Sequence, residues 1–316
     1  MAVADRIAAD YEELTNGCGL LDRSERGKLA LAGSDAAAFL SGLVSNEIEA
    51  LTDGEGCYAA VLTPKGKMLG DLRVLATGDD LLLDTERAAL QEVFNVLWRG
   101  RIGHDVEVQK HTLERGLLAL EGPRARAVAE ADDLSEAEYS HMPAELDGIP
   151  VRLIVAEAGV DLLCEAGRID DLRAALQARG AVSVSDEAAE ARRVERGRPR
   201  YGIDLDDTVI PQEAGLNERA VSFTKGCYVG QETVARLHYK GKPNRHLRGL
   251  RLSRPAEAGG ALRLGDREVG RLGTVAVSPR LGPIALALVR REAEPGATVT
   301  AGEGGVSAEV VELPFS

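Results

Sequence analysis

The residue whose neighbours best suit it for chemistry is Cys227, which lies in the octapeptide Lys225-Gly226-Cys227-Tyr228-Val229-Gly230-Gln231-Glu232. A cysteine becomes reactive when a nearby cation or backbone N–H groups stabilise its thiolate, and Lys225 with the glycines on both sides can supply both. The alternative is a buried, inert cysteine. Cys18, Cys57 and Cys164 are distant in the sequence, so we predict neither a dithiol nor a zinc or cluster site.

The histidines do not form a recognisable catalytic constellation with this cysteine. His238 is the only one near Cys227 in the sequence, and a His/Cys nucleophile pair would need its ring folded onto the thiol. Phosphate loops, dinucleotide fingerprints and hydrolase elbows are absent from the sequence.

The helices and strands that must position these side chains contain a repeated pattern in the sequence. Residues 29–33 and 118–122 each lead into an Ala-rich helix, and residues 80–84 and 161–165 each lead into an amphipathic one. Two units of roughly 80 to 90 residues, each combining antiparallel strands with two helices, explain this order better than one doubly wound sheet. Chance recurrence of Leu/Ala strings is the alternative. The seam between two such units is a natural ligand cleft.

From about Asn244 the sequence changes to short strands separated by glycines, which predicts a small β-barrel or sandwich. We therefore expect an α+β protein with a first unit at 22–114, a second formed by 1–21 and 115–240, and a barrel at 244–316.

A basic strip joins the second unit to the barrel. No acid occurs between Thr233 and Ala256, although the segment contains Arg236, Lys240, Lys242, Arg245, Arg248, Arg251 and Arg254. The strip could bind an anionic ligand tail or an acidic partner, or it could be a solvated linker that balances acidic neighbours.

Composition limits the partners. With 51 acidic against 38 basic residues the net charge is −13, and aromatics are 3%, so direct nucleic-acid binding is disfavoured. No apolar run approaches the roughly 18 residues of a membrane span. Asp5, Arg6 and Asp10 stand where a signal peptide needs an apolar core, which predicts a cytoplasmic protein without a membrane anchor.

The octapeptide resembles the K-G-C-[FY]-x-G-Q-E signature of YgfZ-type proteins, in the folate-binding YgfZ/GcvT family. Residues 193–197, 201–204 and 211–216 are similar to the R-x-E-x-G…Y-G-x-D…P-x-E-A-G-L stretch shared with aminomethyltransferases. The similarity extends upstream and downstream to residues 31–43, 58–71, 270–275 and 285–287. It covers most of the chain and implies a three-domain ring around a central folate cleft.

The resemblance also implies folate contacts. Glu195 falls at the position of the family's pterin-binding glutamate, and a carboxylate can accept two parallel bonds from a pterin's ring N–H and exocyclic amine. Tyr58 matches a pocket tyrosine, although a tyrosine in such a strand can equally belong to the core. Asp84 begins the stretch 84–87 that replaces the transferases' N-A-x-N, and it is included among the expected cofactor contacts.

Asp71 matches the second aspartate of the transferases' D-D-L, whose carboxylate assists one-carbon chemistry, but Gly70 replaces the first. This departure and the altered 84–87 stretch argue against a conventional enzyme. We therefore expect a tetrahydrofolate-binding accessory protein for assembly or repair of iron-sulfur enzymes, including, as the resemblance implies, tRNA-modifying ones. Its partners would be tetrahydrofolate or a one-carbon derivative and iron-sulfur client or assembly proteins.

Two alternatives remain open at this point. One is a tetrahydrofolate-dependent aminomethyl or methyl transferase with Asp71 as the catalytic acid group. The other is a pure interaction protein that keeps the fold without folate. The Cys227 signature distinguishes the accessory protein from the transferase. Measured folate binding would distinguish either of these from a pure interaction protein.

Overall fold

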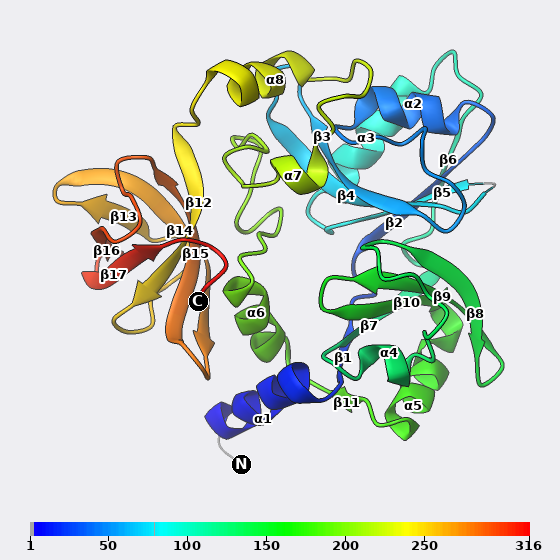
Figure 1. Cartoon of the computed structure of the whole chain (residues 1–316), viewed down its shortest axis with the longest axis horizontal. Coiled ribbons are helices and arrows are strands. Elements are labelled where there is room, and N and C mark those ends of the chain that lie inside the picture. Colours follow the sequence, from blue (N-terminus) through cyan, green and yellow to red (C-terminus); the bar gives the residue numbers. More distant parts are fainter. Residues whose placement is uncertain (1–2, 79) are drawn as a thin grey trace.

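The computed structural model describes residues 3–78 and 80–316, which form two units of sheet and helices beside a closed barrel (Figure 1). The first unit is a five-stranded antiparallel sheet of order β3-β4-β5-β2-β6. Its strands are β2 (Gly27–Ala32), β3 (Gly56–Leu62), β4 (Met68–Ala76), β5 (Asp80–Thr85) and β6 (Glu107–Lys110). Helices α2 (Ala36–Leu43) and α3 (Leu90–Gly100) cover one face, where Phe39, Leu40, Val93 and Leu97 pack on buried strand residues.

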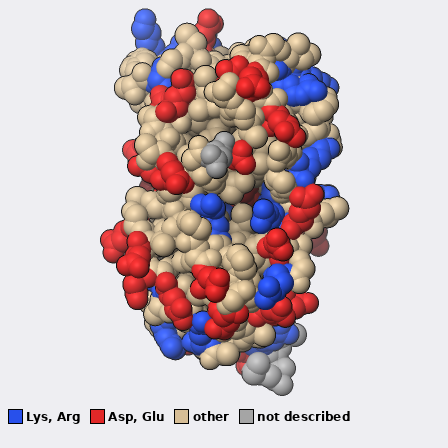
Figure 2. Space-filling view, turned by 90° about the vertical axis from the view of Figure 1, so that its right-hand side faces the viewer, with Lys and Arg blue, Asp and Glu red and all other residues tan. Residues whose placement is uncertain are grey.

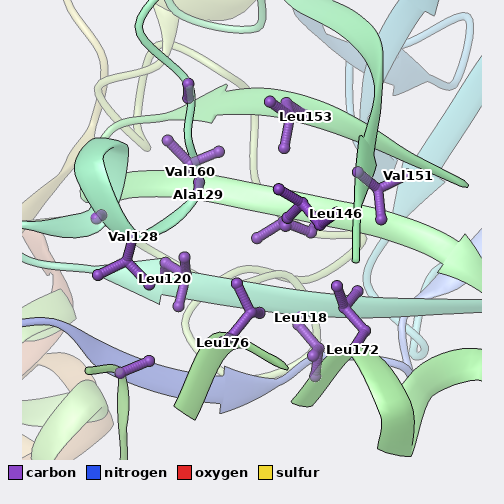
Figure 3. Packing of buried hydrophobic residues seen from close by; sticks show 14 of the residues in the cluster. Leu118, Leu120, Val128, Ala129, Leu146, Val151, Leu153, Val160, Leu172 and Leu176 are labelled. Carbon is purple, nitrogen blue, oxygen red and sulfur yellow. The ribbon is translucent and has the colours of Figure 1, made fainter. Parts of the chain in front are cut away.

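The second unit is a six-stranded sheet of order β11-β1-β7-β10-β9-β8. Its strands are β1 (Gly19–Asp22), β7 (Arg115–Glu121), β8 (His141–Leu146), β9 (Ile149–Ala156), β10 (Gly159–Glu165) and β11 (Val182–Ser183). Helices α4 (Ala125–Val128) and α5 (Ile169–Ala178), with the short 3₁₀ turn Ala166–Arg168, complete it. Figure 3 shows Leu172 and Leu176 pointing from α5 toward Leu118 and Leu120 on β7.

The two units share one plan, which confirms the predicted pair of similar sheet-and-helix domains. The run β3-β4-β5-β2 of the first sheet corresponds to β8-β9-β10-β7 of the second. Strand β1 lies beside β7 as β6 lies beside β2, and the short β11 adds an edge that the first sheet lacks. The second Ala-rich helix is the short α4. Helix α4 ends at Val128 because the chain turns at Glu130, whose backbone is left-handed with φ 52°.

The helix-free faces of the two sheets are turned toward each other. Leu75 of β4 and Ile154 of β9 belong to one buried cluster, against which Leu82 of β5 and Leu163 of β10 pack. These strands bound the space between the two sheets. Their pairing register determines which side chains face that space.

The C-terminal strands form the predicted barrel, closed in the order β12-β15-β14-β13-β16-β17. They are β12 (Arg245–Leu252), β13 (Ala261–Leu264), β14 (Arg267–Ser278), β15 (Gly282–Arg290), β16 (Thr298–Ala301) and β17 (Val306–Val311). The remaining helices are α1 (Val3–Asn16), α6 (Asp186–Glu195), α7 (Asn217–Ala220) and α8 (Gln231–Lys240). Helix α6 packs between α1 and the barrel (Figure 1). Across the described residues, no helix combines the length and apolar character needed to span a membrane.

Candidate functional site

A cleft of about 250 Å³ lies where the two sheets meet α6 and the segment after it. Its walls combine two tyrosines, Tyr58 and Tyr139, with many charged side chains. The charged residues include Arg26, Asp71, Arg73, Glu86, Glu121, Asp161, Glu190, Arg193, Arg200 and Arg219. The structure thus brings two of the expected site residues, Tyr58 and Asp71, into one cleft.

Tyr58 and Asp71 are positioned by neighbouring strands. Tyr58 is opposite Arg73 and Ala60 is opposite Asp71 in the β3–β4 ladder, so alternation places all four side chains on the inner face. The Tyr58 hydroxyl donates to Asp71 Oδ2 at 2.7 Å. The Asp71 residue is only 4% exposed.

Burial raises the pKa of Asp71 to about 6; the hydrogen bond from Tyr58 opposes the rise, and the negative charge of Glu86 adds to it. Burial and the adjacent Asp71 carboxylate raise the pKa of Tyr58 well above its usual value, which keeps its hydroxyl protonated as a donor. The pair therefore combines a fixed hydroxyl donor with a carboxyl group that can gain or lose a proton near neutral pH.

A chain of alternating charges surrounds this pair. Asp161 of β10 meets Arg73, Arg73 meets Asp84, and Asp84 meets Arg26. The chain continues through Glu86, Arg200, Glu190 and Arg193 to Asp204, with Arg200 at 3.3 Å from Glu86 and 3.1 Å from Glu190. Alternation satisfies each buried charge, so side chains from both sheets and α6 hold one another in place.

Asp84 belongs to this chain and is not among the cleft-lining residues. Its two oxygens accept from Arg26 Nε at 2.7 Å and from Arg73 Nε at 2.6 Å. Burial acts to raise the pKa of Asp84, but the two guanidinium groups outweigh it and hold the pKa below its usual value. The geometry therefore makes Asp84 a support for Arg73, and the expected direct contact with a cofactor stays a prediction.

Glu195 lies in the last turn of α6, on the side facing α1 and the barrel, and it does not line the cleft. Its carboxylate is 3% exposed and accepts hydrogen bonds from Tyr11, at 2.9 Å to each oxygen, and from the Ser278 hydroxyl. Arg192 Nη1 lies 3.1 Å from Oε2. These bonds occupy the carboxylate edge that a pterin would need, and the expected contact of Glu195 with a pterin stays a prediction.

The octapeptide is built around the C-terminal end of helix α2. The Lys225 ammonium group donates to the carbonyls of Ser41, Val44 and Asn46 at 2.6, 3.1 and 2.7 Å, and the Val229 N–H donates to Gly42 O at 3.2 Å. Burial lowers the pKa of Lys225. Lys225 therefore caps a helix, which differs from the expected role of stabilising the Cys227 thiolate.

The rest of the octapeptide also has identifiable packing roles. Tyr228 is buried in the cluster between β3 and α8, and Gly230 is left-handed with φ 86°. A Cβ at Gly230 would lie 2.6 Å from Thr63 O, so only glycine fits there. Gln231 and Glu232 begin α8. Gly226 is in open space, where an added Cβ would meet no atom within 4 Å.

Cys227 is an exposed free cysteine at the apex of this anchored loop, outside the cleft lining. The His238 ring stacks on Phe223 with ring centroids 3.8 Å apart. Within the ranges 3–78 and 80–316, no three His, Cys, Asp or Glu side chains gather as metal ligands.

The basic strip splits into two parts. Arg236 and Lys240 lie on α8, whereas Arg245, Arg248 and later arginines lie on or beside the barrel strand β12. Arg245 pairs with Glu213 at 2.8 Å and Arg248 with Glu312 at 2.9 Å. Arg245 and Arg248 therefore balance acidic neighbours, which was one of the two roles considered for the basic strip.

Sequence reasoning missed Asp161 and Arg73, which connect the two sheets, and Tyr139 with Arg219. Asp161 and Arg73 each lie inside a mostly apolar strand, and a charge at such a position was the signal that could have identified them. Arg219 donates to the Tyr139 hydroxyl at 2.8 Å and lies 5.1 Å from the Tyr58 ring centroid. These contacts join residues more than 70 positions apart, and nothing in the local sequence indicates them.

Comparison with known proteins agrees with this architecture. Residues 1–225 match the GCVT N-terminal domain and residues 245–316 match the glycine cleavage T-protein C-terminal barrel domain. An aminomethyltransferase of Rubrobacter xylanophilus is 30% identical, with 98% of this chain and 86% of that protein covered. An aminomethyltransferase of Moorella thermoacetica is also 30% identical, with 98% and 89% covered.

The glycine cleavage system aminomethyltransferase T of Bartonella henselae has the same fold, with a TM-score of 0.86, 24% identity, and 98% of this chain and 89% of that one covered. With both family domains matched in order, over nearly the whole length, the chain belongs to the glycine cleavage T-protein family, with an aminomethyltransferase-like fold.

Proposed function

We propose that the protein binds tetrahydrofolate, or a one-carbon derivative of it, in the central cleft and acts there as an aminomethyl or methyl transferase. The observation that carries this proposal is the buried pair of Tyr58 and Asp71, in which burial raises the pKa of the carboxyl group to about 6. The aminomethyltransferases among the relatives support this function better than the accessory role expected from the sequence.

The residues of the cleft suit a folate. The rings of Tyr58 and Tyr139 are stacked with centroids 6.4 Å apart and form an aromatic wall. A volume of about 250 Å³ is below the roughly 300–1,000 Å³ typical of sites that enclose a whole ligand, so the cleft would enclose the pterin head and leave the tail outside. Arg196 and Arg198 also line the cleft, where they pair with Glu121 and Glu157, and their remaining N–H groups would donate to a glutamate tail.

Asp161 is the cleft carboxylate that best suits the pterin edge. It is 8% exposed, lines the cleft, and uses Oδ2 for Arg73. Glu86 and Glu190, by comparison, each bind two arginines. The competing assignment, Glu195, would require its carboxylate to leave Tyr11 and Ser278.

The chemistry at Asp71 follows from its proton affinity. When bound, tetrahydrofolate would supply the two amine nitrogens that take up the one-carbon unit. The bonds from that carbon to the donor's sulfur and amine would break, and the protons lost by the folate nitrogens would end on the leaving thiolate and ammonia. Asp71 would hold such a proton in transit. A carboxylate with a pKa of about 6 is ionised at pH 7.5 and can still hold this proton. The Tyr58 hydroxyl occupies Oδ2, fixes the orientation of the group, and leaves Oδ1 to receive the proton.

Two measurements test the proposal: calorimetric titration with tetrahydrofolate, and the formation of methylenetetrahydrofolate from a lipoyl-bound aminomethyl donor. Asp71→Asn should lower turnover by about 100-fold or more while folate affinity stays within about threefold. Asp207→Asn, at an exposed loop position, is the matched control. Turnover by Asp71→Asn equal to that of the control would overturn the role of Asp71.

The pterin contact has its own paired test. Asp161→Asn should weaken tetrahydrofolate at least tenfold, because a charge-assisted bond contributes about 1.5–3 kcal/mol, and Glu195→Gln should not. The opposite pattern would restore the assignment of Glu195.

A second candidate function, a YgfZ-type accessory protein for iron-sulfur enzymes, is favoured by one specific observation. The loop that carries Cys227 is anchored on both sides to helix α2, yet the thiol itself is exposed and contributes little to packing. Folate binding without any turnover in the assay above, together with loss of iron-sulfur enzyme activity in cells that carry Cys227→Ser, would favour this candidate.

A further inference from the structure

A second cavity, of about 430 Å³, lies between the two sheets on the far side of Arg73 from the folate cleft. Arg73 lines both spaces, and its ion pairs with Asp84 and Asp161 form the partition. The cavity is the larger of the two and has a volume typical of ligand sites. None of the roles argued above for the cleft or the octapeptide uses it.

The body of the cavity is apolar on both sides. In the second sheet, Leu163 is paired with Leu117 on one side and with Arg152 on the other, so these three side chains share the inner face. In the first sheet, Leu82 is paired with Leu75 and with Ala30, which form the facing row. Leucines at this inter-sheet seam would normally interdigitate, and here they leave a space large enough for an apolar group.

Two guanidinium groups lie at the edge of this apolar space. Arg115 is two residues before Leu117 on β7 and is exposed on the same face, and Arg152 is half-buried on β9. Burial lowers the pKa of Arg152, with Asp53 opposing and the charge of Arg115 adding to the effect, so the two cations lie near each other.

Neither guanidinium forms an ion pair within 4 Å among residues 3–78 and 80–316. Arg152 Nη1 donates to His141 Nδ1 at 2.8 Å, and burial together with Arg152 lowers the pKa of His141, which keeps that imidazole neutral. Glu165 is the cross-strand neighbour of Arg115, and no ion pair forms between them. Two arginines without a carboxylate partner are notable in a chain of net charge −13.

Lys28 adds a third cation deeper in the cavity. It is 4% exposed, and its ammonium group donates to the carbonyls of Ser24 and Arg26 at 2.8 Å each. Asp80 is the acid that lines the cavity besides the paired Asp84. Figure 2 looks onto this side of the molecule and shows Lys and Arg side chains gathered at mid-height, around the hollow between its upper and lower halves.

We propose that this cavity is a second ligand site, which binds a small amphipathic carboxylate. Its apolar body would lie between Leu75, Leu82, Leu117 and Leu163, and its carboxylate would accept hydrogen bonds from Arg115 and Arg152. A neutral ligand of the same shape would leave the guanidinium groups unpaired, and a cation would be repelled. The site is separate from the proposed folate site and does not depend on folate binding.

The test uses decanoate as the probe, with decanol as its neutral counterpart, in calorimetric titrations of the full chain. Decanoate should bind saturably at one site, and decanol at least tenfold more weakly. The double variant Arg115→Gln/Arg152→Gln should weaken decanoate at least tenfold, whereas Arg168→Gln, in the 3₁₀ turn and outside the cavity lining, should not change its affinity.

A filling variant separates this site from the folate cleft. Leu163→Trp should abolish decanoate binding by occupying the cavity, and saturating tetrahydrofolate should leave decanoate bound to the wild type. Equal affinity for decanoate and decanol, unchanged affinity in the double or the filling variant, or full displacement by tetrahydrofolate would each overturn the proposal. Thermal melting of each variant checks that a loss of binding does not come from unfolding.

Discussion

Replacing Asp71 by Asn removes a negative charge that the fold disfavours, so the variant should be more stable than the wild type at neutral pH. Asp71 has a pKa of about 6 in the fold, against an ordinary value of 3.8. Because each tenfold change in proton affinity corresponds to about 1.4 kcal/mol, ionised Asp71 is about 3 kcal/mol less favourable in the folded protein than in the unfolded chain. An Asn side chain keeps an oxygen that can accept the Tyr58 hydrogen bond, so most of this difference should appear as stability.

The pH dependence identifies the cause. The pKa of Asp71 is higher in the folded protein than in the unfolded chain. The stability that protonated Asp71 contributes to the fold is therefore fully present below about pH 4 and is lost as the pH rises through about 6. Urea unfolding should therefore show Asp71→Asn to be more stable by about 1–3 kcal/mol at pH 7.5, with the advantage disappearing at about pH 4.

The exposed Asp207→Asn variant should show no such change over the same pH range. A variant Asp71→Asn that is less stable than the wild type at pH 7.5, or a difference that does not vary with pH, would refute the reasoning. The same substitution is expected to lower transferase turnover, so stability and activity should change in opposite directions.

Three further predictions concern residues outside the cleft. Glu195→Gln should lower the free energy of unfolding by about 1–3 kcal/mol in urea titrations, because the bonds from Tyr11 and Ser278 lose their charge, and tetrahydrofolate affinity should stay unchanged. Lys225→Met leaves three helix-end carbonyls without their donor, so we expect a loss of about 2–4 kcal/mol, whereas a wild-type melting temperature would contradict the capping role. Cys227→Ser should melt within about 2 °C of the wild type and bind folate normally, since the thiol is exposed, and a large drop in melting temperature would show a packing role.

The architecture could be predicted because each unit repeats the same apolar strings, and because the glycine-punctuated strands after Asn244 lack any helical period. The predicted division at 22–114, at 1–21 with 115–240, and at 244–316 stays a prediction. Tyr58 and Asp71 were identified from the family resemblance, and the register of the β3–β4 ladder then places their side chains on one face.

Glu195 shows what a motif match leaves out. A match gives the position of a residue, whereas the direction of its side chain depends on the helix. At about 100° per residue, Glu195 points roughly 160° away from Arg193, which faces the cleft, and this rotation can be counted along the helical residues from the sequence alone.

The partners of Lys225 could not be obtained in this way. They are carbonyls at the end of a helix that lies about 180 positions earlier in the chain, and only the tertiary structure brings the two segments together. Because Lys225 is two residues before Cys227, the sequence suggested that its charge would stabilise the Cys227 thiolate. In the structure the lysine side chain is directed to the carbonyls instead.

The chain of alternating charges has a mechanical consequence. Two of its links, Arg73 with Asp161 and Arg200 with Glu86, connect the first sheet to the rest of the molecule, whereas Arg73–Asp84 and Arg26–Asp84 lie within the first unit. Any hinge motion that moves the first sheet away from its surroundings must break these two links. The side chains of Arg73 and Asp161 are 10% and 11% exposed, so salt should screen this link little. Salt should weaken the more exposed Arg200–Glu86 link more, so opening of the first unit should depend only modestly on ionic strength.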